Sequence, residues 1–415
     1  MRTFVSTGPG RLAALVLLTA ATFATSRQAR AEIVAGTFDY SNVMTFAEDG
    51  SGFPGQLVSP FDGGLQAAAG VIFGDDGFLY VSSRSTGQVL KFNGTTGAPL
   101  GPFATLNGSG TAPAGLKFGP DGNLYVADSG SGGNVQRFNG ATGAYIDTVT
   151  TGMAAAGNLL FGPNGELYAA DFGAGSVVRV TNLDTPLQTQ ETFVQPHAGG
   201  LQNPASLLLI PSVENPGTDD LLVVDLIGNS ILRYDSTGAP VTNPMFAYIQ
   251  PNPDFSPLPP PATVPVYISN FPSDIMYSRN GTKILVDVLG KDFNQSGQII
   301  QFNLDGSDPT VLFDHLPAVS SLALTLAPGD TNRDGVADFI DLGVLLNHYD
   351  QSGDQRQGDF NGTGVVDFID LGILLNNYSS AEILAGPAAA VPEPGTLALA
   401  ALAVVGLLLA ARRKR

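Results

Sequence analysis

The sequence predicts a mainly β protein, with a six-bladed β-propeller followed by a small α-helical domain and a C-terminal transmembrane helix. Three observations predict this order. A strand-and-turn pattern recurs six times between residues 32 and 327, an acidic segment directly after it is duplicated, and the last 25 residues combine an apolar run with a basic end. The 51 Gly and 29 Pro among 415 residues also favour short strands joined by tight turns.

The net charge and the cysteine content restrict which molecules the protein can bind and which chemistry it can perform. The net charge is −18, and eight of the cations lie in the two ends of the chain, so the middle is still more acidic. Such a surface repels nucleic acid and suits an exported protein or one that binds cations, and we expect no nucleic-acid partner. The chain has no cysteine, which excludes disulfides, thiolate zinc sites and cysteine nucleophiles.

Residues 1–31 are predicted to be a signal peptide. Leu12 to Ala24 forms a mostly apolar run, and Ala29 and Ala31 are the small residues that signal peptidase recognises before a cleavage at Glu32. An uncleaved anchor is the alternative, although the run is shorter than the ~20 residues needed to span a bilayer.

One element of the repeat is a strand in which a β-branched residue is followed three positions later by an aromatic or apolar residue. Successive copies lie 42 to 68 residues apart, the length of a four-stranded blade with its loops. Their β-branched positions are Val43, Val89, Val135, Val177, Ile231 and Ile299. Glycine turns follow most copies, which indicates hairpins.

A second element precedes the first within each unit and consists of an apolar pair, a D-G or N-G type turn and a strand that tends to end in Asp. The clearest copies are LKFGPDGNLYVAD, LLFGPNGELYAAD and VIFGDDGFLYVSS. EIVAGT near residue 32 lacks a first strand, and SSLALT near residue 320 lacks the later ones. The two segments are therefore predicted to pair and to close the ring, which leaves no open sheet edge.

These motifs resemble NHL-type six-bladed propellers over residues 32–327. The resemblance implies a fold and no particular function, because such propellers serve as lyases, lactonases, receptors and adhesion modules. The Pro-rich residues 251–267 are expected to form a loop between blades, and the alternative is a polyproline ligand.

Four acids at one position of the second element leave two functions open. They are Asp128, Asp171, Asp225 and Asp287. Acids that a repeat dictates are expected to fix loops as hydrogen-bond acceptors, so we assign no catalytic residue and no organic cofactor. A non-catalytic module that contacts protein or polysaccharide is the preferred function. The alternative is a metal-assisted lactonase or lyase in the ring channel.

After residue 328, Gly329 to Tyr349 and Gly358 to Tyr378 repeat each other 29 residues apart. Each starts with the spacing of a calcium loop, with oxygen ligands at positions 1, 3, 5, 9 and 12, a carbonyl at position 7 and Gly at position 6. The predicted ligands of the first loop are Asp330, Asn332, Asp334, Val336, Asp338 and Asp341. Those of the second loop are Asp359, Asn361, Thr363, Val365, Asp367 and Asp370. Two Ca²⁺ ions are expected, and the alternative is an acidic segment without metal.

Each loop is closed by Asp rather than Glu and is followed by an amphipathic helix, and residues 328–380 therefore resemble the dockerin type I module, with EF-hand-like loop–helix units. The resemblance implies docking onto a cohesin-like protein through residues beside position 12. These are Phe339, Ile340, Phe368 and Ile369. They are apolar here, unlike the small hydroxyl residues of cellulosomal modules, which argues against a cellulosomal partner.

The C-terminal residues 391–415 follow a linker, residues 381–390, and contain Pro392, Glu393 and Pro394, an uncharged run and RRKR. A simple tail anchor with a cytoplasmic end is one interpretation. The arrangement also resembles the PEP-CTERM sorting signal, which implies that an exosortase recognises the motif and removes the transmembrane helix and tail. The protein is then exported to the cell surface or the extracellular matrix and contacts the membrane only before processing.

Overall fold

The structure is a computed structural model and describes residues 32–183, 185–250, 266–267, 271–279, 281–289, 297–325, 329–331, 337–353, 357–360 and 365–378. The predicted signal peptide, most of the Pro-rich segment and the predicted C-terminal helix lie outside these ranges. Within them, no helix has the length and apolar character needed to cross a membrane.

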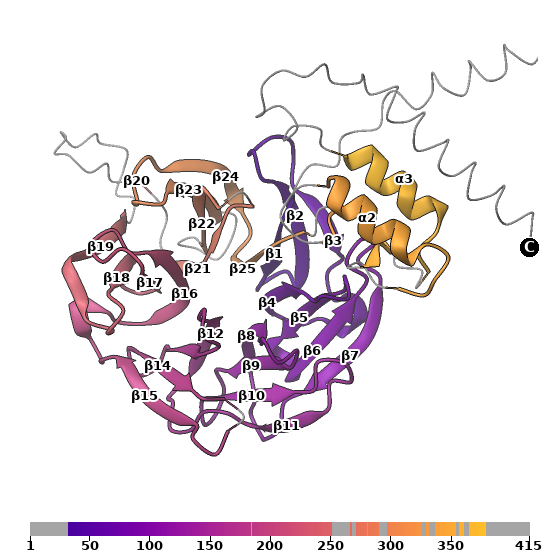
Figure 1. The fold of residues 1–415 in the computed structure, drawn as a ribbon. Coiled ribbons are helices and arrows are strands. Elements are labelled where there is room, and N and C mark those ends of the chain that lie inside the picture. Colours follow the sequence, from indigo (N-terminus) through magenta and orange to yellow (C-terminus); the bar gives the residue numbers. More distant parts are fainter. Residues whose placement is uncertain are drawn as a thin grey trace, which may run out of the picture. The chain divides into compact units, whose positions relative to one another are not determined.

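Six sheets form a β-propeller around a central axis (Figure 1). Blade I consists of β25 (Val319–Leu324), β1 (Glu32–Thr37), β2 (Asn42–Ala47) and β3 (Gly55–Val58). Blade II consists of β4 (Ala68–Phe73), β5 (Leu79–Ser83), β6 (Gln88–Phe92) and β7 (Pro99–Thr105). Blade III consists of β8 (Pro113–Phe118), β9 (Leu124–Asp128), β10 (Asn134–Phe138) and β11 (Tyr145–Thr148).

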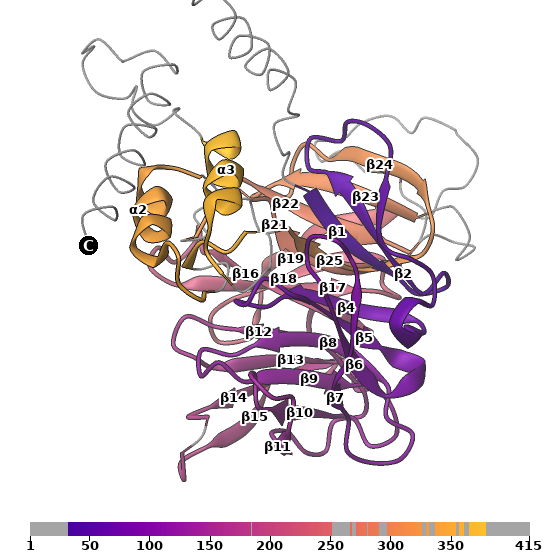
Figure 2. The ribbon, with the colours of Figure 1, turned by 90° about the vertical axis from the view of Figure 1, so that its right-hand side faces the viewer.

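The other three blades follow the same order of strands from the axis outward (Figure 2). Blade IV consists of β12 (Ala156–Phe161), β13 (Leu167–Asp171), β14 (Ser176–Thr181) and β15 (Thr189–Val194). Blade V consists of β16 (Pro204–Pro211), β17 (Asp219–Asp225), β18 (Ser230–Tyr234), β19 (Pro240–Gln250) and β20 (Val266–Tyr267). Blade VI consists of β21 (Pro272–Tyr277), β22 (Lys283–Val288), β23 (Gly297–Asn303) and β24 (Thr310–Leu316). Short 3₁₀ turns are η1 (Asp62–Gly64), η2 (Arg84–Thr86) and η3 (Ala198–Gly200).

The ring is closed by strands from opposite ends of the propeller sequence. β1 pairs with β25 in antiparallel register, with Ile33 opposite Leu324 and Gly36 opposite Ser321. The predicted pairing of these two segments is therefore confirmed. It removes the exposed strand edges that an open ring would leave for aggregation.

Blade V differs from the four-stranded expectation. Its last strand, β20, pairs in parallel with β19, with Ile249 opposite Val266. The prediction of a loop over residues 251–267 is thus wrong for its last two residues, which form a strand, and residues 251–265 lie outside the described ranges. No turn signal separates these two residues from the Pro-rich segment in the sequence.

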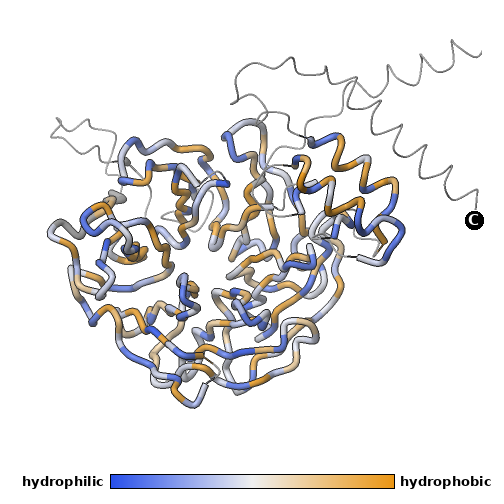
Figure 3. The backbone as a smooth tube through the Cα atoms, viewed as in Figure 1, coloured by the Kyte–Doolittle hydropathy of each residue, from blue (hydrophilic) through white to orange (hydrophobic). Residues whose placement is uncertain are grey.

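The hydrophobic core is divided into six clusters, one between each pair of neighbouring blades. Because side chains alternate along a strand, Leu285 packs towards blade I while the next residue, Val286, packs towards blade V. Figure 3 shows the hydrophobic residues that recur along the strands. Burial of each Val, Leu or Phe contributes roughly 1.5–3 kcal/mol, so the interfaces between blades supply most of the stability.

Two helices, α2 (Phe339–His348) and α3 (Phe368–Asn377), follow the duplicated loops. The packing is reciprocal: a Cβ on Gly329, before the first loop, would lie 3.0 Å from the Cα of Leu374 on α3, and one on Gly358, before the second, would lie 2.9 Å from the Cβ of Leu345 on α2. Both glycines have positive φ. Glycine is therefore required here by the backbone conformation as well as by the close approach.

Candidate functional site

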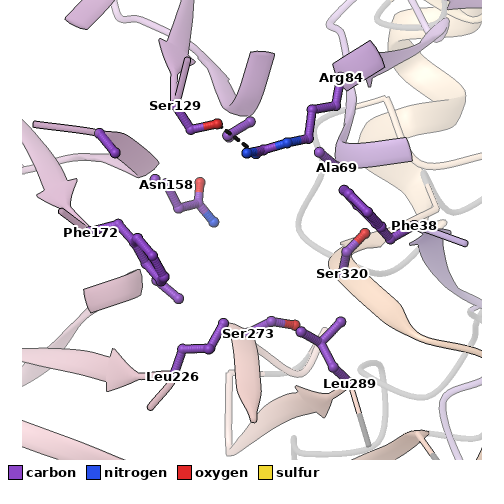
Figure 4. A pocket seen from close by; sticks show the side chains of 15 residues that line it. Phe38, Ala69, Arg84, Ser129, Asn158, Phe172, Leu226, Ser273, Leu289 and Ser320 are labelled. Atoms are coloured by element: carbon purple, nitrogen blue, oxygen red, sulfur yellow. Dashed lines mark hydrogen bonds between the residues drawn. The ribbon is translucent and has the colours of Figure 1, made fainter. Parts of the chain in front are cut away.

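The propeller channel contains a cavity of about 420 Å³ that is built from equivalent positions of all six blades (Figure 4). The inner ring of its lining is the second residue of each innermost strand. Its members are Ala69, Ala114, Gly157, Ala205, Ser273 and Ser320. All six side chains are small, and this leaves space at the axis for a ligand.

The loop ring, the second part of the lining, is formed by the residue that directly follows the second strand of each blade. Its members are Phe38, Arg84, Ser129, Phe172, Leu226 and Leu289. Each donates its backbone N–H to a carbonyl just before or at the start of an innermost strand, over 2.9 to 3.1 Å; the acceptors are Ala318, Ala67, Ala112, Ala155, Asn203 and Phe271. The six backbones are therefore fixed alike, and only the side chains differ.

The side chains of the loop ring divide the cavity into a polar and an apolar part. Arg84 and Ser129 come from neighbouring blades, and the leucines at 226 and 289 lie opposite them (Figure 4). The two phenyl rings, from Phe38 and Phe172, lie on the two remaining sides and face each other across the cavity. The arrangement suits a molecule with one charged end and an apolar body.

Among the described residues that line the cavity, Arg84 is the only cation. Its Nη1 donates to the Ser129 hydroxyl over 2.5 Å, and its guanidinium carbon lies 6.0 Å from the Phe38 ring centroid. Burial lowers the pKa of Arg84, and the charge of Asp128 acts in the opposite direction. The Ser129 hydroxyl in turn donates to the carbonyl of Ala112 over 2.9 Å, which holds the guanidinium at a fixed place.

Next along the innermost strands, the third residues form a buried hydrogen-bonded network. Asp274 accepts hydrogen bonds from Asn158 Nδ2 at 2.9 Å and from the hydroxyl groups of Ser206 at 2.5 Å and Ser321 at 3.2 Å. Blade III has glycine at this position, and a Cβ on Gly115 would lie 2.4 Å from Asn158 Oδ1. The network joins blades IV, V, VI and I beside the cavity, and Asn158 is its member in the lining.

Three of the four repeated acids fix loops, as the structural interpretation expects. Asp225 accepts the N–H groups of Gln202 and Asn203, both at 2.9 Å, and that of Gly228 at 3.1 Å. Asp128 accepts the N–H of Ala112 at 2.8 Å and that of Gly130 at 2.9 Å, and Asp171 makes the same type of contact to residues 154, 155 and 174. None of these three carboxylates lines the cavity.

The fourth acid, Asp287, does not lie at the strand position of the other three. The prediction that all four acids occupy one position of the repeat was therefore wrong for Asp287. In blade V Pro204 lies opposite Asp225, whereas in blade VI the equivalent Pro272 lies opposite Val288 and Asp274 lies opposite Asp287. A shift of one residue turns a side chain to the other face of the sheet, so Asp287 faces blade I. The pattern KILVD resembles LLVVD in sequence, and only the strand pairing separates them.

Asp287 is fully buried beside a second carboxylate. Its Oδ1 accepts hydrogen bonds from the Ser273 hydroxyl at 2.7 Å and from the Asp274 N–H, while its Oδ2 has no partner among the described residues. Loss of solvation, together with the charge of Asp274, raises the pKa of Asp287 well above its usual range. The carboxyl therefore retains its proton at pH values where an exposed Asp is ionised.

The predicted calcium loops are described in part. Asn332, Asp334, Val336, Asn361 and Thr363 lie outside the described residues. Of the other predicted ligands, the carboxylates at positions 1 and 12 of both loops are buried; they are Asp330, Asp341, Asp359 and Asp370. Val365, at position 7 of the second loop, is exposed. Among the side chains that the structure does describe, no three His, Asp or Glu groups are close enough together to hold a metal.

The position-12 carboxylates make the same contacts in both loops. Asp341 accepts the N–H groups of Thr331 and Asp338 at 2.7 Å, and Asp370 accepts those of Phe360 and Asp367 at 2.8 Å. The position-9 acids cap the helices, since Asp338 Oδ1 accepts the Ile340 N–H and Asp367 Oδ1 accepts the Ile369 N–H, each at 2.7 Å. The duplication in sequence is thus a duplication in geometry.

The residues between these two acids are exposed in both copies. Phe339 and Phe368 are 73% and 63% exposed, and Ile340 and Ile369 are 58% and 59% exposed. Large apolar side chains at this exposure, repeated at the start of two helices, are typical of a contact surface for another protein.

The histidines stay outside the cavity lining. His197 Nδ1 lies 3.1 Å from the carbonyl of Leu201, His348 Nδ1 lies 2.9 Å from that of Val344, and His315 lies 3.4 Å from Asp314. Sequence reasoning missed the loop ring that does line it. The six residues of the loop ring share no residue type. The only feature of the sequence that could have identified them is their position, directly after the second strand of each repeat unit.

Comparisons with known proteins agree with this architecture. Residues 390–415 match the PEP-CTERM protein-sorting motif. A protein of unknown function from Bacteroides caccae is similar at 13% identity and a TM-score of 0.51, over 72% of this chain and 99% of its own. A chain of a nidogen/laminin complex is similar at 11% identity and a TM-score of 0.53, over 71% of this chain and 98% of its own. No curated protein matches the sequence.

At these identities the two structures establish the fold alone. The chain is a six-bladed β-propeller protein followed by two short helices. It carries a PEP-CTERM motif, which implies processing by an exosortase and export to the cell surface.

Proposed function

We propose that this protein is a non-catalytic binding or scaffold protein of the cell surface or extracellular matrix, attached through calcium-dependent docking by residues 328–380. The observation that carries the proposal is the repeated pair of exposed apolar residues, Phe339–Ile340 and Phe368–Ile369, held directly beside two equivalent acidic loops. A cohesin-like partner with an apolar surface would cover these pairs.

Calcium fits the residues of the loops. Each loop buries two carboxylates, at positions 1 and 12, within a short acidic segment. Carboxylate, amide and carbonyl oxygens at this spacing are the ligands that Ca²⁺ prefers. Two ions, held by the residues from Asp330 to Asp341 and from Asp359 to Asp370, would neutralise these segments and fix the exposed pairs.

For the propeller, we propose contact with protein or polysaccharide through its loops rather than metal-assisted lactonase or lyase chemistry. Support comes from the channel, whose described lining has one guanidinium, hydroxyl groups, an amide and apolar side chains, without a carboxylate or an imidazole. Of the four acids on which a lactonase or lyase would depend, Asp128, Asp171 and Asp225 accept backbone N–H groups. The fourth, Asp287, is not among the described residues that line the cavity.

Calcium titration of the full exported chain after chelator treatment tests the proposal. We expect two binding events by calorimetry, with a loss of at least about tenfold in affinity at one loop for Asp341→Asn and at the other for Asp370→Asn, because each change removes a ligand charge. Asp305→Asn, in an exposed turn, is the matched control and is expected to bind as the wild type does.

Attachment is tested on cells that export the protein. Washing with a calcium chelator is expected to release it, and a Phe339→Ser, Phe368→Ser double variant is expected to bind calcium normally but to be lost from the surface. Retention of the wild type after chelation, or absence of calcium binding, would contradict the proposal.

A further inference from the structure

The guanidinium of Arg84 is a positive charge in the cavity, and the described lining contains no negative charge to pair with it. In the part of the chain that the structure describes, no carboxylate oxygen lies within 4.0 Å of the Arg84 guanidinium. The printed hydrogen bond of this group goes to a neutral hydroxyl, that of Ser129, so most of its five N–H donors are available. Arg84 is partly buried, and the charge of Asp128 acts on it without forming an ion pair within this distance, so a bound anion would pair directly with the free guanidinium donors.

We propose that the channel cavity binds a small monocarboxylate with a flat apolar body, whose carboxylate pairs with Arg84 and whose body lies between Phe38 and Phe172. Neither the calcium loops nor the exposed apolar pairs take part in this site. The proposal therefore stands or falls separately from calcium-dependent attachment.

The shape of the lining selects the body of the ligand. Phe38 and Phe172 face each other from blades I and IV, while Leu226 and Leu289 lie opposite the polar part (Figure 4). Two facing phenyl groups accommodate a flat ring by stacking or edge contacts, and the leucines exclude water from its far end. The volume of about 420 Å³ lies within the range of small-molecule sites.

The charges select the anion. A guanidinium offers two parallel N–H donors that match the two oxygens of a carboxylate. The remainder of the chain is strongly acidic, with a net charge of −18, so a polyanion would be repelled from the channel as a whole. The other polar groups nearby are already engaged: Ser320 donates to the carbonyl of Ala68 and Ser273 to Asp287. The single guanidinium can therefore neutralise one negative charge, which is the charge of a monocarboxylate.

Calorimetry on the full exported chain with benzoate as the probe tests the proposal, with benzamide as a neutral ligand of the same shape and acetate as a carboxylate without a body. Benzoate is expected to bind at least about tenfold more tightly than either. Arg84→Gln is expected to weaken benzoate roughly 10- to 100-fold and to leave benzamide unchanged, and Arg84→Lys, which keeps the charge but not the planar pair of donors, is expected to lie between.

Two further variants separate the ligand site from general effects on the fold. Arg179→Gln is the matched control, because this arginine also lies over a phenyl ring, that of Phe193, but pairs with Glu191 away from the cavity. It should leave benzoate binding unchanged. Leu226→Asn should weaken benzoate and not acetate, and it provides the test if the Arg84 variants unfold. Equal affinity for benzoate and benzamide, no effect of Arg84→Gln in a folded variant, or no binding of benzoate at 10 mM would overturn the proposal.

Discussion

Blades V and VI show how one residue of strand register changes the role of an acid. Asp225 ends β17, faces blade IV and accepts three backbone N–H groups. Asp287 lies one position earlier on the equivalent strand β22, faces blade I and meets a second carboxylate, that of Asp274. Both acids are buried and occur in similar sequence patterns. The comparison teaches that the side of the sheet, and not the local sequence, decides whether a buried Asp fixes a loop or meets a second carboxylate.

The largest effect is expected from Asp225→Ala. This change leaves three N–H groups without their acceptor at a buried site, and each unsatisfied donor is costly, so the free energy of unfolding should fall by about 3 kcal/mol or more in urea denaturation. Asp305→Ala is the matched control at an exposed turn, where water replaces the lost bonds, and its loss should be below about 1 kcal/mol. Equal losses for the two variants would show that the buried bonds to Asp225 contribute no more than the exposed bonds to Asp305.

Asp287→Asn is expected to have the opposite sign. The pKa of Asp287 is raised in the folded protein, whereas the unfolded chain has a value near 3.9, so the folded state keeps a proton that the unfolded state has lost. Stability should therefore be highest below about pH 4 with respect to this group and should fall as the pH rises towards and through the raised pKa.

The amide cannot ionise, so Asp287→Asn should remove this decline and raise the free energy of unfolding at pH 7 by about 1 kcal/mol or more. Thermal unfolding of wild type and variant between pH 4.5 and 8 measures the difference. Asp225→Asn, at the loop-fixing position, should destabilise instead. A difference for Asp287→Asn that does not change with pH would show that its carboxyl is ionised in the fold.

The smallest effect is expected at Asn229. In blade VI its side chain accepts the backbone N–H that the repeated Asp accepts in blade V. The N–H of Phe271, just before β21, donates to Asn229 Oδ1 from blade V over 3.0 Å. Asn229 has positive φ, so Asn229→Gly removes the acceptor while the backbone keeps its conformation. We expect a loss of about 1 kcal/mol in urea denaturation, and near-wild-type stability for Asn229→Asp, which keeps the acceptor. Equal stability of the Gly and Asp variants would show that this bond does not matter.

The sequence by itself determined the number of blades, the strand order within them and the closure of the ring. These features follow from local physics: alternating apolar residues, glycine turns and a repeat of constant design are each visible in a short window. The loop-fixing role of Asp128, Asp171 and Asp225 was predictable for the same reason, since an acid at the end of a strand meets the chain that enters its own blade. The sorting motif is likewise local and was recognisable from Pro392, Glu393 and Pro394 together with the uncharged run and the basic end that follow them.

Only the tertiary structure decided which side chains meet at the axis and which face Asp287 takes. The loop ring joins single residues, from Phe38 to Leu289, that are far apart in sequence and share no residue type. Their proximity exists only after six sheets have closed around one axis. The register of β22 depends on pairing with β21, and a slip of one residue exchanges the two faces of a strand. Local patterns cannot specify contacts that long-range pairing creates, and the candidate ligand site consists of such contacts.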